Sequence, residues 1–241
     1  MLIFLEVKLK IFQTVKRFFE YFSRFELILY AVSVTAVTVS YLVFDGGSVL
    51  TLMASLAGVS SLILCAKGNP IGQVLMLIFS LLYAVISYGF AYYGEMISYL
   101  FMTAPMAVIS LVSWLRHPYG NKRSEVTVAS PSKRTLSVGL AFTVAVTAAF
   151  YFILRELGTV NLIPSTVSIA TSFAAAYLTF ARSPAYALAY GLNDIVLIVL
   201  WVLASLSDIG YVSVTVCFCV FLVNDLYGFV SWLRMAKRQG L

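Results

Sequence analysis

Long uncharged stretches, separated by short segments that hold nearly all of the charge, dominate this chain of 241 residues. Only 11% of the residues are charged and 61% are hydrophobic, whereas about 25% are charged in soluble domains. A helix of roughly 20 apolar residues crosses a bilayer, so the sequence predicts an all-α integral membrane protein with eight transmembrane helices. The candidate stretches, of which the last two hold one aspartate each, are residues 27–44, 46–66, 68–94, 96–115, 135–154, 157–181, 183–206 and 209–233.

The basic residues are distributed unequally between the two sides of the membrane. Eight spans place both termini on one side, and fifteen of the sixteen Lys and Arg residues then fall on that side, leaving only Arg155 opposite. Because basic loops stay in the cytoplasm, we expect both termini and loop 117–134 to be cytoplasmic. The net charge of +6 therefore reflects topology, and we expect no nucleic-acid partner. The acidic residues on the far side are Asp45, Glu95, Glu156 and Asp208.

The first 26 residues combine five basic side chains with interleaved aromatic and aliphatic ones. They contain no clean apolar core followed by a small-residue cleavage site, so a cleaved signal peptide is not expected. The pattern predicts that segment 1–26 is an amphipathic helix on the cytoplasmic surface of the lipid bilayer. Segment 27–44 then forms an additional N-terminal transmembrane helix, and residues 235–241 form a cytoplasmic tail.

A five-residue motif occurs twice in the chain. Val112–Arg116 and Val230–Arg234 both read Val-Ser-Trp-Leu-Arg, at an offset of 118 residues. Each copy ends a unit of three predicted spans, and one linker span between the units gives both the same orientation. The sequence therefore predicts two parallel three-helix repeats about an axis along the membrane normal, as in SWEET-type transporters. The predicted parts are the first repeat 48–116, the cytoplasmic loop 117–134, the linker helix 135–155 and the second repeat 161–234.

Two of the ten acidic residues lie inside apolar spans, and each directly follows an asparagine. The two pairs are Asn193-Asp194 and Asn224-Asp225. A carboxylate in hydrocarbon costs about 2.5–3.5 kcal/mol, so we expect both pairs to lie on a buried polar pathway. At 1.5 Å per residue, Asp194 lies ~18 Å and Asp225 ~14 Å from the basic residue at the cytoplasmic end of its span. The similar depths predict one shared polar layer.

Aromatic residues share helical faces with these polar residues. Tyr190 precedes Asp194 by one turn, and Trp201 follows Asp194 by two turns. We predict that one solute cavity between the last two spans is lined by Asn193, Asp194, Asn224 and Tyr227. Asn193 and Asp194 differ by about 100° around a helix, so which of the two faces the solute stays open. Further candidates are Tyr190, Trp201, Asp225 and, in the first repeat, Gln73, Tyr83 and Tyr88.

Such a cavity suits a small, flat, polar or cationic solute, which aromatic rings can stack and carboxylates can bind. Alternatively, these residues only join helices by hydrogen bonds. A membrane-embedded enzyme would need histidines or metal ligands near the aspartates, but the single histidine, His117, lies at a span end. Cys65, Cys217 and Cys219 form no C-x-x-C pair. We therefore expect no enzyme, no metal and no cofactor; a structural or sensory subunit is a further alternative.

Two stretches of the second repeat resemble the PnuC family of bacterial vitamin transporters. They are Tyr190–Trp201, which reads Tyr-Gly-Leu-Asn-Asp-Ile-Val-Leu-Ile-Val-Leu-Trp, and Phe221–Trp232. Tyr92-Tyr-Gly-Glu95, followed by Trp114, is similar to the third span of the family's first repeat. The resemblance covers about residues 48–235, including both repeats and the linker.

The resemblance implies a full-length SWEET-like fold with an extra N-terminal helix, assembled as a homotrimer in the bacterial inner membrane. The best-known family members carry nicotinamide riboside by facilitated diffusion, and cytoplasmic phosphorylation traps the solute. Relatives carry thiamine or riboflavin, which are the runner-up substrates here. The residues to which the resemblance assigns a binding role are Asn193, Asp194, Asn224 and Tyr227, together with Tyr190 and Trp201.

Overall fold

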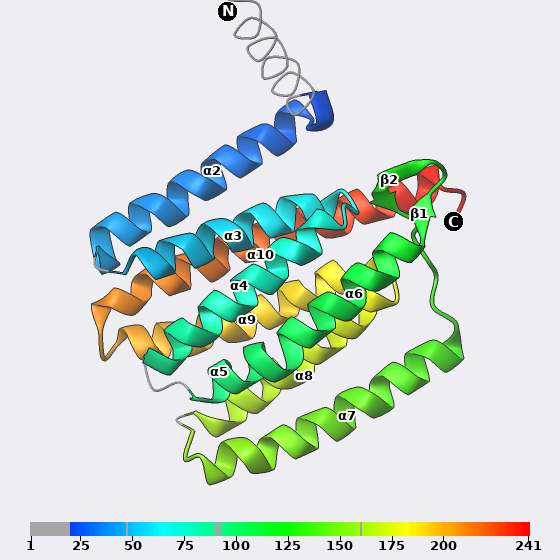
Figure 1. Cartoon of the computed structure of the whole chain (residues 1–241). Coiled ribbons are helices and arrows are strands. Elements are labelled where there is room, and N and C mark those ends of the chain that lie inside the picture. Colours follow the sequence, from blue (N-terminus) through cyan, green and yellow to red (C-terminus); the bar gives the residue numbers. More distant parts are fainter. Residues whose placement is uncertain (1–19, 47, 90–92, 160) are drawn as a thin grey trace, which may run out of the picture.

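The computed structural model describes residues 20–46, 48–89, 93–159 and 161–241, and it is a bundle of long helices (Figure 1). The described part contains eight helices that are long and apolar enough to cross a membrane, which confirms the predicted architecture. Most of the predicted amphipathic segment, residues 1–19, lies outside the described residues. The elements are α2 (Arg24–Ser40, continued by a π-helical turn at Tyr41–Asp45), α3 (Val49–Ala66), α4 (Ile71–Gly89), α5 (Tyr93–Ser98), the π-helical segment η2 (Tyr99–Thr103), α6 (Ala104–Arg116), β1 (Pro118–Tyr119), β2 (Lys122–Val126), α7 (Lys133–Glu156), α8 (Leu162–Phe180), α9 (Ala185–Ser205), the 3-10 turn η3 (Ile209–Tyr211) and α10 (Val212–Arg238).

The helix contacts follow the predicted repeat. In the first unit α4 packs against both α3 and α6, and in the second unit α9 packs against both α8 and α10. Between the units, α3 contacts α10 and α6 contacts α8. The first helix of each unit therefore packs against the third helix of the other. The linker α7 lies against α8, and the additional helix α2 lies against α3 and α10 (Figure 1). The two units therefore face one another across a pseudo-twofold arrangement with one extra helix on each flank.

The third span of the first unit is the irregular one. It consists of α5, the π-helical segment Tyr99–Thr103 and α6, and Pro105 stands at the start of α6. Proline removes one backbone donor and crowds the carbonyl four residues earlier, here that of Phe101. A π-helical turn accommodates such a disturbance and frequently marks a functional site. The consequence is that Tyr99 faces the interior between the units, where it is buried.

The repeated Val-Ser-Trp-Leu-Arg motif joins the two units by hydrogen bonds that are equivalent in both directions. Ser113 Oγ donates to Phe180 O at 2.9 Å, and Trp114 Nε1 donates to Thr179 O at 2.9 Å. In the other copy, Ser231 Oγ donates to the carbonyl of Ala66 at 2.7 Å, and Trp232 Nε1 donates to that of Cys65 at 2.8 Å. Carbonyls in the last turn of a helix lack partners within that helix. We call each Ser-Trp pair with its two carbonyls a latch.

Loop 117–134 packs onto the basic end of the helices, where Lys67, Arg116, Arg182 and Arg234 lie. Residues 126–129, here called the strap, start at the last residue of β2 and cross this end. The amide of Val126 donates to Gly68 O at 2.9 Å, and the amide of Ala129 donates to Arg182 O at 3.0 Å. Gly68 and Arg182 both have a left-handed backbone, at φ 66° and 58°, in the turns that follow α3 and α8. The strap therefore binds the equivalent turn of each unit.

Candidate functional site

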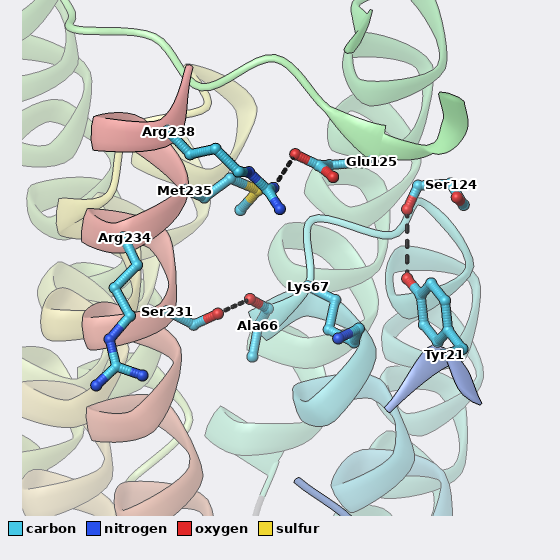
Figure 2. A pocket seen from close by; sticks show the side chains of 9 residues that line it. All are labelled: Tyr21, Ala66, Lys67, Ser124, Glu125, Ser231, Arg234, Met235 and Arg238. Carbon is cyan, nitrogen blue, oxygen red and sulfur yellow. Dashed lines mark hydrogen bonds and ion pairs between the residues drawn. The ribbon is translucent and has the colours of Figure 1, made fainter. Parts of the chain in front are cut away.

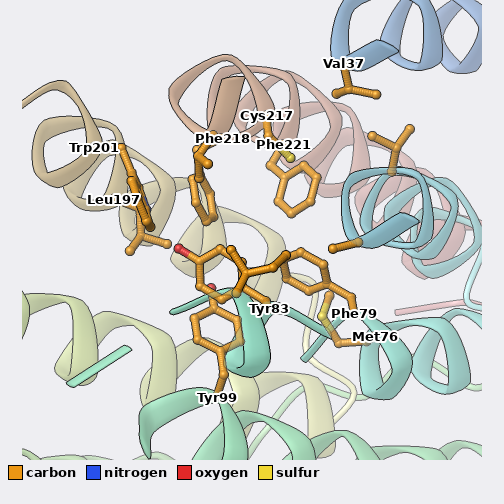
Figure 3. Packing of buried hydrophobic residues seen from close by; sticks show 14 of the residues in the cluster. Val37, Met76, Phe79, Tyr83, Tyr99, Leu197, Trp201, Cys217, Phe218 and Phe221 are labelled. Atoms are coloured by element: carbon orange, nitrogen blue, oxygen red, sulfur yellow. The ribbon is translucent and has the colours of Figure 1, made fainter. Parts of the chain in front are cut away.

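A cluster of aromatic side chains fills the space between the two units toward the end of the bundle that lies opposite the strap. We call it the far cluster; Figure 3 shows Tyr83 at its centre, with Tyr99 on one side and Phe218 on the other. The ring centroid of Tyr83 lies 4.4 Å from that of Tyr99, 5.9 Å from that of Phe218 and 6.2 Å from that of Trp201. These side chains are buried and fill the interior between the units at this level. We call this interior surface between the two units the pathway. The cluster consists of Phe79, Tyr83, Tyr99, Trp201, Phe218 and Phe221.

A second cluster closes the pathway at the basic end. The latch residues Trp114 and Trp232 meet here, with ring centroids 5.3 Å apart, and Tyr186 packs on Trp232 at 4.8 Å. Val126 and Val128 of the strap cover them and are themselves buried. Both tryptophans are fully excluded from solvent, at 0% exposure. This basic-end cluster and the far cluster therefore enclose the middle of the bundle from both sides.

Between the two clusters lies a polar layer. Asp194 of α9 is 3% exposed and Asp225 of α10 is 4% exposed. The two side chains are electrostatic neighbours on the adjacent helices α9 and α10. Two neighbouring buried carboxylates repel one another, so bringing both into the layer favours a ligand or partner that offsets negative charge. Asp194 Oδ2 has no hydrogen-bond partner among the described residues, which leaves a buried acceptor in the layer.

Other groups of the pathway surround this carboxyl pair. Tyr190, one turn before Asp194, and Tyr99 of the first unit are both electrostatic neighbours of Asp194. Cys65 is an electrostatic neighbour of Asp225 and accepts a hydrogen bond of 3.3 Å from Gln73 Nε2. The layer thus combines two carboxyl groups, phenol groups and an amide. The described residues contain no group of three or more His, Cys, Asp or Glu side chains that could hold a metal ion.

The structure does not bring the four residues predicted to line one cavity together. Asn193 faces α8, where its Oδ1 accepts a hydrogen bond of 2.9 Å from Thr171. Asn224 faces α2, where its Nδ2 donates to Ser33 Oγ at 2.9 Å. The physical reason is helix geometry: adjacent residues project about 100° apart, so Asp194 and Asp225 take the inner face and the asparagines do not. Of the four, only Asp194 lies in the polar layer.

Tyr227 also lies on the α2 side of α10. Its hydroxyl donates to Glu26 Oε1 at 2.8 Å, and its ring packs on Phe25 at 5.3 Å. Glu26 in turn binds Lys67 Nζ with both carboxylate oxygens at 3.0 Å. Tyr227 therefore belongs to the contact between α2 and the second unit, and the structure does not bring it into the pathway.

The secondary candidates divide in the same way. Gln73, Tyr83, Tyr190, Trp201 and Asp225 all lie along the pathway. The side chain of Tyr88 is 63% exposed on the outer face of α4, away from the pathway. The buried positions of α4 repeat every three to four residues through Tyr83 and Ser87, which turns position 88 outward.

Some pathway residues were not predicted. Phe218 and Phe221 precede Asp225 by seven and four residues, so helical spacing from Asp225 could have found them. Tyr99 gives no such signal, because the π-helical segment changes the spacing of its span. Glu95 is buried at 8% exposure, its Oε2 has no hydrogen-bond partner among the described residues, and it is an electrostatic neighbour of Tyr83 and Tyr99. Because Glu95 lies at the end of a predicted span, the sequence indicates only that it belongs to the side of the membrane opposite the termini.

Comparison with known proteins identifies related sequences over most of the chain. A family model described as "Nicotinamide mononucleotide transporter" matches residues 48–234. The nicotinamide riboside transporter PnuC of Neisseria mucosa is 26% identical over 202 residues, which cover 82% of this chain and 76% of the relative. The protein of the same name from Haemophilus influenzae is 23% identical over 218 residues, covering 89% of this chain and 92% of the relative.

A solved structure has the same fold. The crystal structure of the vitamin B3 transporter PnuC superposes with a TM-score of 0.79 and 24% sequence identity, covering 91% of this chain and 94% of that one. Little of either chain therefore lies outside the superposed part.

Proposed function

Because the chain belongs to the nicotinamide mononucleotide transporter family, we propose that this multi-pass membrane transporter carries nicotinamide riboside across the bacterial inner membrane. The observation that supports this substrate most directly is the buried carboxyl pair of Asp194 and Asp225 in a closed, aromatic-lined pathway. Nicotinamide riboside is a flat pyridinium cation with a ribose tail. Aromatic rings and carboxylates favour a flat cation, and the hydroxyl groups of ribose need hydrogen-bond partners.

The charges along the pathway favour the riboside over the mononucleotide. The charged side chains that the described pathway buries are acidic, namely Asp194, Asp225 and Glu95. The basic residues near it, Lys67, Arg116, Arg182 and Arg234, lie at the ends of helices. A phosphate group among buried carboxyl groups would meet like charge without a nearby cation, which costs several kcal/mol in a low-dielectric environment. We therefore assign the riboside to this chain as its substrate, although the matched family model is named after the mononucleotide.

The residues that we propose for substrate binding are those that the pathway brings together. Tyr190, Tyr83 and Trp201 supply rings on which the pyridinium can stack. Asp194 and Asp225 balance its charge, and Gln73 supplies an amide for a hydroxyl or carboxamide group. Asn193 and Asn224 do not contact the substrate in this proposal. They join α9 to α8 and α10 to α2 by hydrogen bonds. Their loss would displace the aspartates that follow them in sequence.

The proposed mechanism is facilitated diffusion by alternating opening of the two closed ends. The far cluster and the basic-end cluster are both packed in this structure, which corresponds to an occluded state. Release at the basic end requires the strap and the latches to separate. Because basic residues gather at this end, the positive-inside rule places it in the cytoplasm, where phosphorylation would trap the solute. We further propose that three copies of the chain assemble, in line with the family resemblance.

Binding measurements on the purified protein test this proposal. Nicotinamide riboside should bind at least tenfold more tightly than nicotinamide mononucleotide, which is about 1.4 kcal/mol. Thiamine, which also carries an aromatic cation, is the runner-up, whereas riboflavin is larger and uncharged. Tighter binding of the mononucleotide would contradict the charge argument. Tighter binding of thiamine or riboflavin would contradict the proposal and indicate that the protein carries that vitamin.

A further inference from the structure

A pocket of about 610 Å³ lies at the basic end of the bundle, outside the transport pathway. It is enclosed by the ends of α6 and α8, by the start of the linker α7 and by the segment that follows the strap. One side of the pocket is apolar and the other is polar. The residues that line it are Val108, Ile109, Val112, Ser113, Arg116, His117, Ala129, Ser130, Pro131, Ser132, Thr135, Phe180, Ala181 and Arg182.

The apolar side of the pocket lies on an exposed face of a helix that is long and apolar enough to cross a membrane. Val108, Ile109 and Val112 of α6 are 43%, 46% and 41% exposed, although they lie inside a predicted transmembrane helix. From Val108 to Arg116 the helix rises ~12 Å at 1.5 Å per residue. This side is therefore an apolar surface that runs from the hydrocarbon region up to the basic end of the helix.

The polar side of the pocket is positively charged. Arg116 and Arg182 both line it, and none of the described residues that line it is acidic. Partial burial lowers the pKa of the Arg182 guanidinium, the direction expected for a cation without a compensating carboxylate. The helix α7 begins at the same place, with Ser132 as its N-cap. A helix N-terminus adds partial positive charge and favours an anion.

The repeat supplies a comparison inside the same molecule. A pocket of about 640 Å³ in the other half is lined by Ala66, Lys67, Ser231 and Arg234, which are equivalent to Ala181, Arg182, Ser113 and Arg116 (Figure 2). There two of the three basic side chains have an acidic partner. Lys67 binds Glu26 at 3.0 Å, and Arg238, which also lines that pocket, binds Glu125. The pocket beside α7 differs in that neither of its two arginines has an acidic partner among the described residues and no acidic residue lines it.

We propose that the pocket between α6, α7 and α8 binds an anionic phospholipid. Its phosphate lies between Arg116 and Arg182 near the start of α7, and an acyl chain follows Val108, Ile109 and Val112. Basic pockets between transmembrane helices hold anionic headgroups in this way. The site is independent of the transported solute, because it lies on the outer side of α6 and shares no residue with the polar layer.

Lipid titration of the delipidated, detergent-solubilised transporter, followed by native mass spectrometry, tests the proposal. Phosphatidylglycerol should bind more tightly than phosphatidylcholine. Arg116→Gln should weaken phosphatidylglycerol binding roughly fivefold, since one basic residue near an anionic lipid surface contributes about 1 kcal/mol. Arg234→Gln, the equivalent change in the pocket that Glu26 and Glu125 adjoin, is the matched control and should leave lipid binding unchanged.

Three outcomes would overturn the proposal. Equal binding of the two lipids to the wild-type protein would remove the charge argument, whether or not the variants fold. Full protection of the site by millimolar glycerol 3-phosphate would identify a soluble phosphate ligand in place of a lipid. A change in the number of subunits on Arg116→Gln, with no effect on lipid binding, would identify the pocket as a contact between copies of the chain.

Discussion

Replacing Asp194 and Asp225 by asparagine, singly and together, tests whether the two carboxyl groups act as one charged unit. They are electrostatic neighbours and are 3% and 4% exposed. The hypothesis under test is that the two groups share one proton and carry one negative charge in total. Asp194→Asn leaves Asp225 as a carboxylate that can accept a hydrogen bond from the new amide, so the layer keeps its charge. Likewise, Asp225→Asn leaves Asp194 as the carboxylate, and the layer again keeps its charge.

The expected magnitudes follow from this charge count. Each single variant should bind nicotinamide riboside within about fivefold of wild type, because the loss is that of one neutral hydrogen bond, ~1 kcal/mol. The double variant removes the last negative charge. An interaction with a charged group contributes about 1.5–3 kcal/mol, so its affinity should fall a further 10- to 150-fold. The effects of the two changes are therefore strongly non-additive.

Isothermal titration of the purified, folded variants measures these affinities. The reduced, uncharged form of the riboside is the matched ligand, and the double variant should bind it nearly as well as wild type does. Asn193→Leu, which changes the residue beside Asp194 that faces α8, controls for disturbance of the helix. Two single variants that each lose about as much affinity as the double variant would refute the shared-proton interpretation.

Four further outcomes are expected. Trp114→Phe and Trp232→Phe should each lower the free energy of unfolding by about 0.5–1.5 kcal/mol, because the acceptor carbonyls keep backbone partners in Arg182 N and Gly68 N. Thermal unfolding measures this loss. A large loss in only one of the two variants would contradict the equivalence of the latches. Gly72→Ala should cost about 1–3 kcal/mol, since its Cβ would lie 2.8 Å from the backbone nitrogen of Cys65, whereas Gly191→Ala meets no described atom closer than 3.4 Å and should be mild. Cysteines introduced at Asn121 and Ser207 should react with a membrane-impermeant label from opposite sides of the membrane; reaction from the same side would exclude the proposed topology. Uptake into liposomes down a substrate gradient should persist after sodium and proton gradients are collapsed, and accumulation driven by either gradient would exclude facilitated diffusion.

The number of spans could be predicted from the sequence because hydropathy and charge act locally. A span of about 20 uncharged residues is recognisable without its neighbours. The inner face of α10 could be predicted only in part, because this helix carries polar residues on two faces. Asp225 faces the pathway and Asn224 faces α2. Which face of α10 meets which neighbouring helix depends on tertiary packing. The spacing of residues within one helix does not indicate that choice.

The strap and Tyr99 show two other limits. Val126 and Val128 lie in a loop beside Lys122, Arg123 and Glu125, so composition indicates an exposed connection, but the structure buries both valines over the tryptophans. Tyr99 lies in a π-helical segment, and its direction cannot be read from a regular helical period. The sequence contains all three residues, but neither the long-range contact that buries the valines nor the backbone irregularity that directs Tyr99 can be read from it.

The latches have a consequence for how one unit relates to the other. Each unit has a serine and a tryptophan donor at the end of its third helix, and two acceptor carbonyls at the end of its first helix. A surface that contains both halves of a contact is self-complementary, which is the property of an isologous interface between identical subunits. A single three-helix unit therefore already contains the groups needed to pair with a copy of itself. The chain makes within one polypeptide the contact that a twofold dimer of such units would make between two.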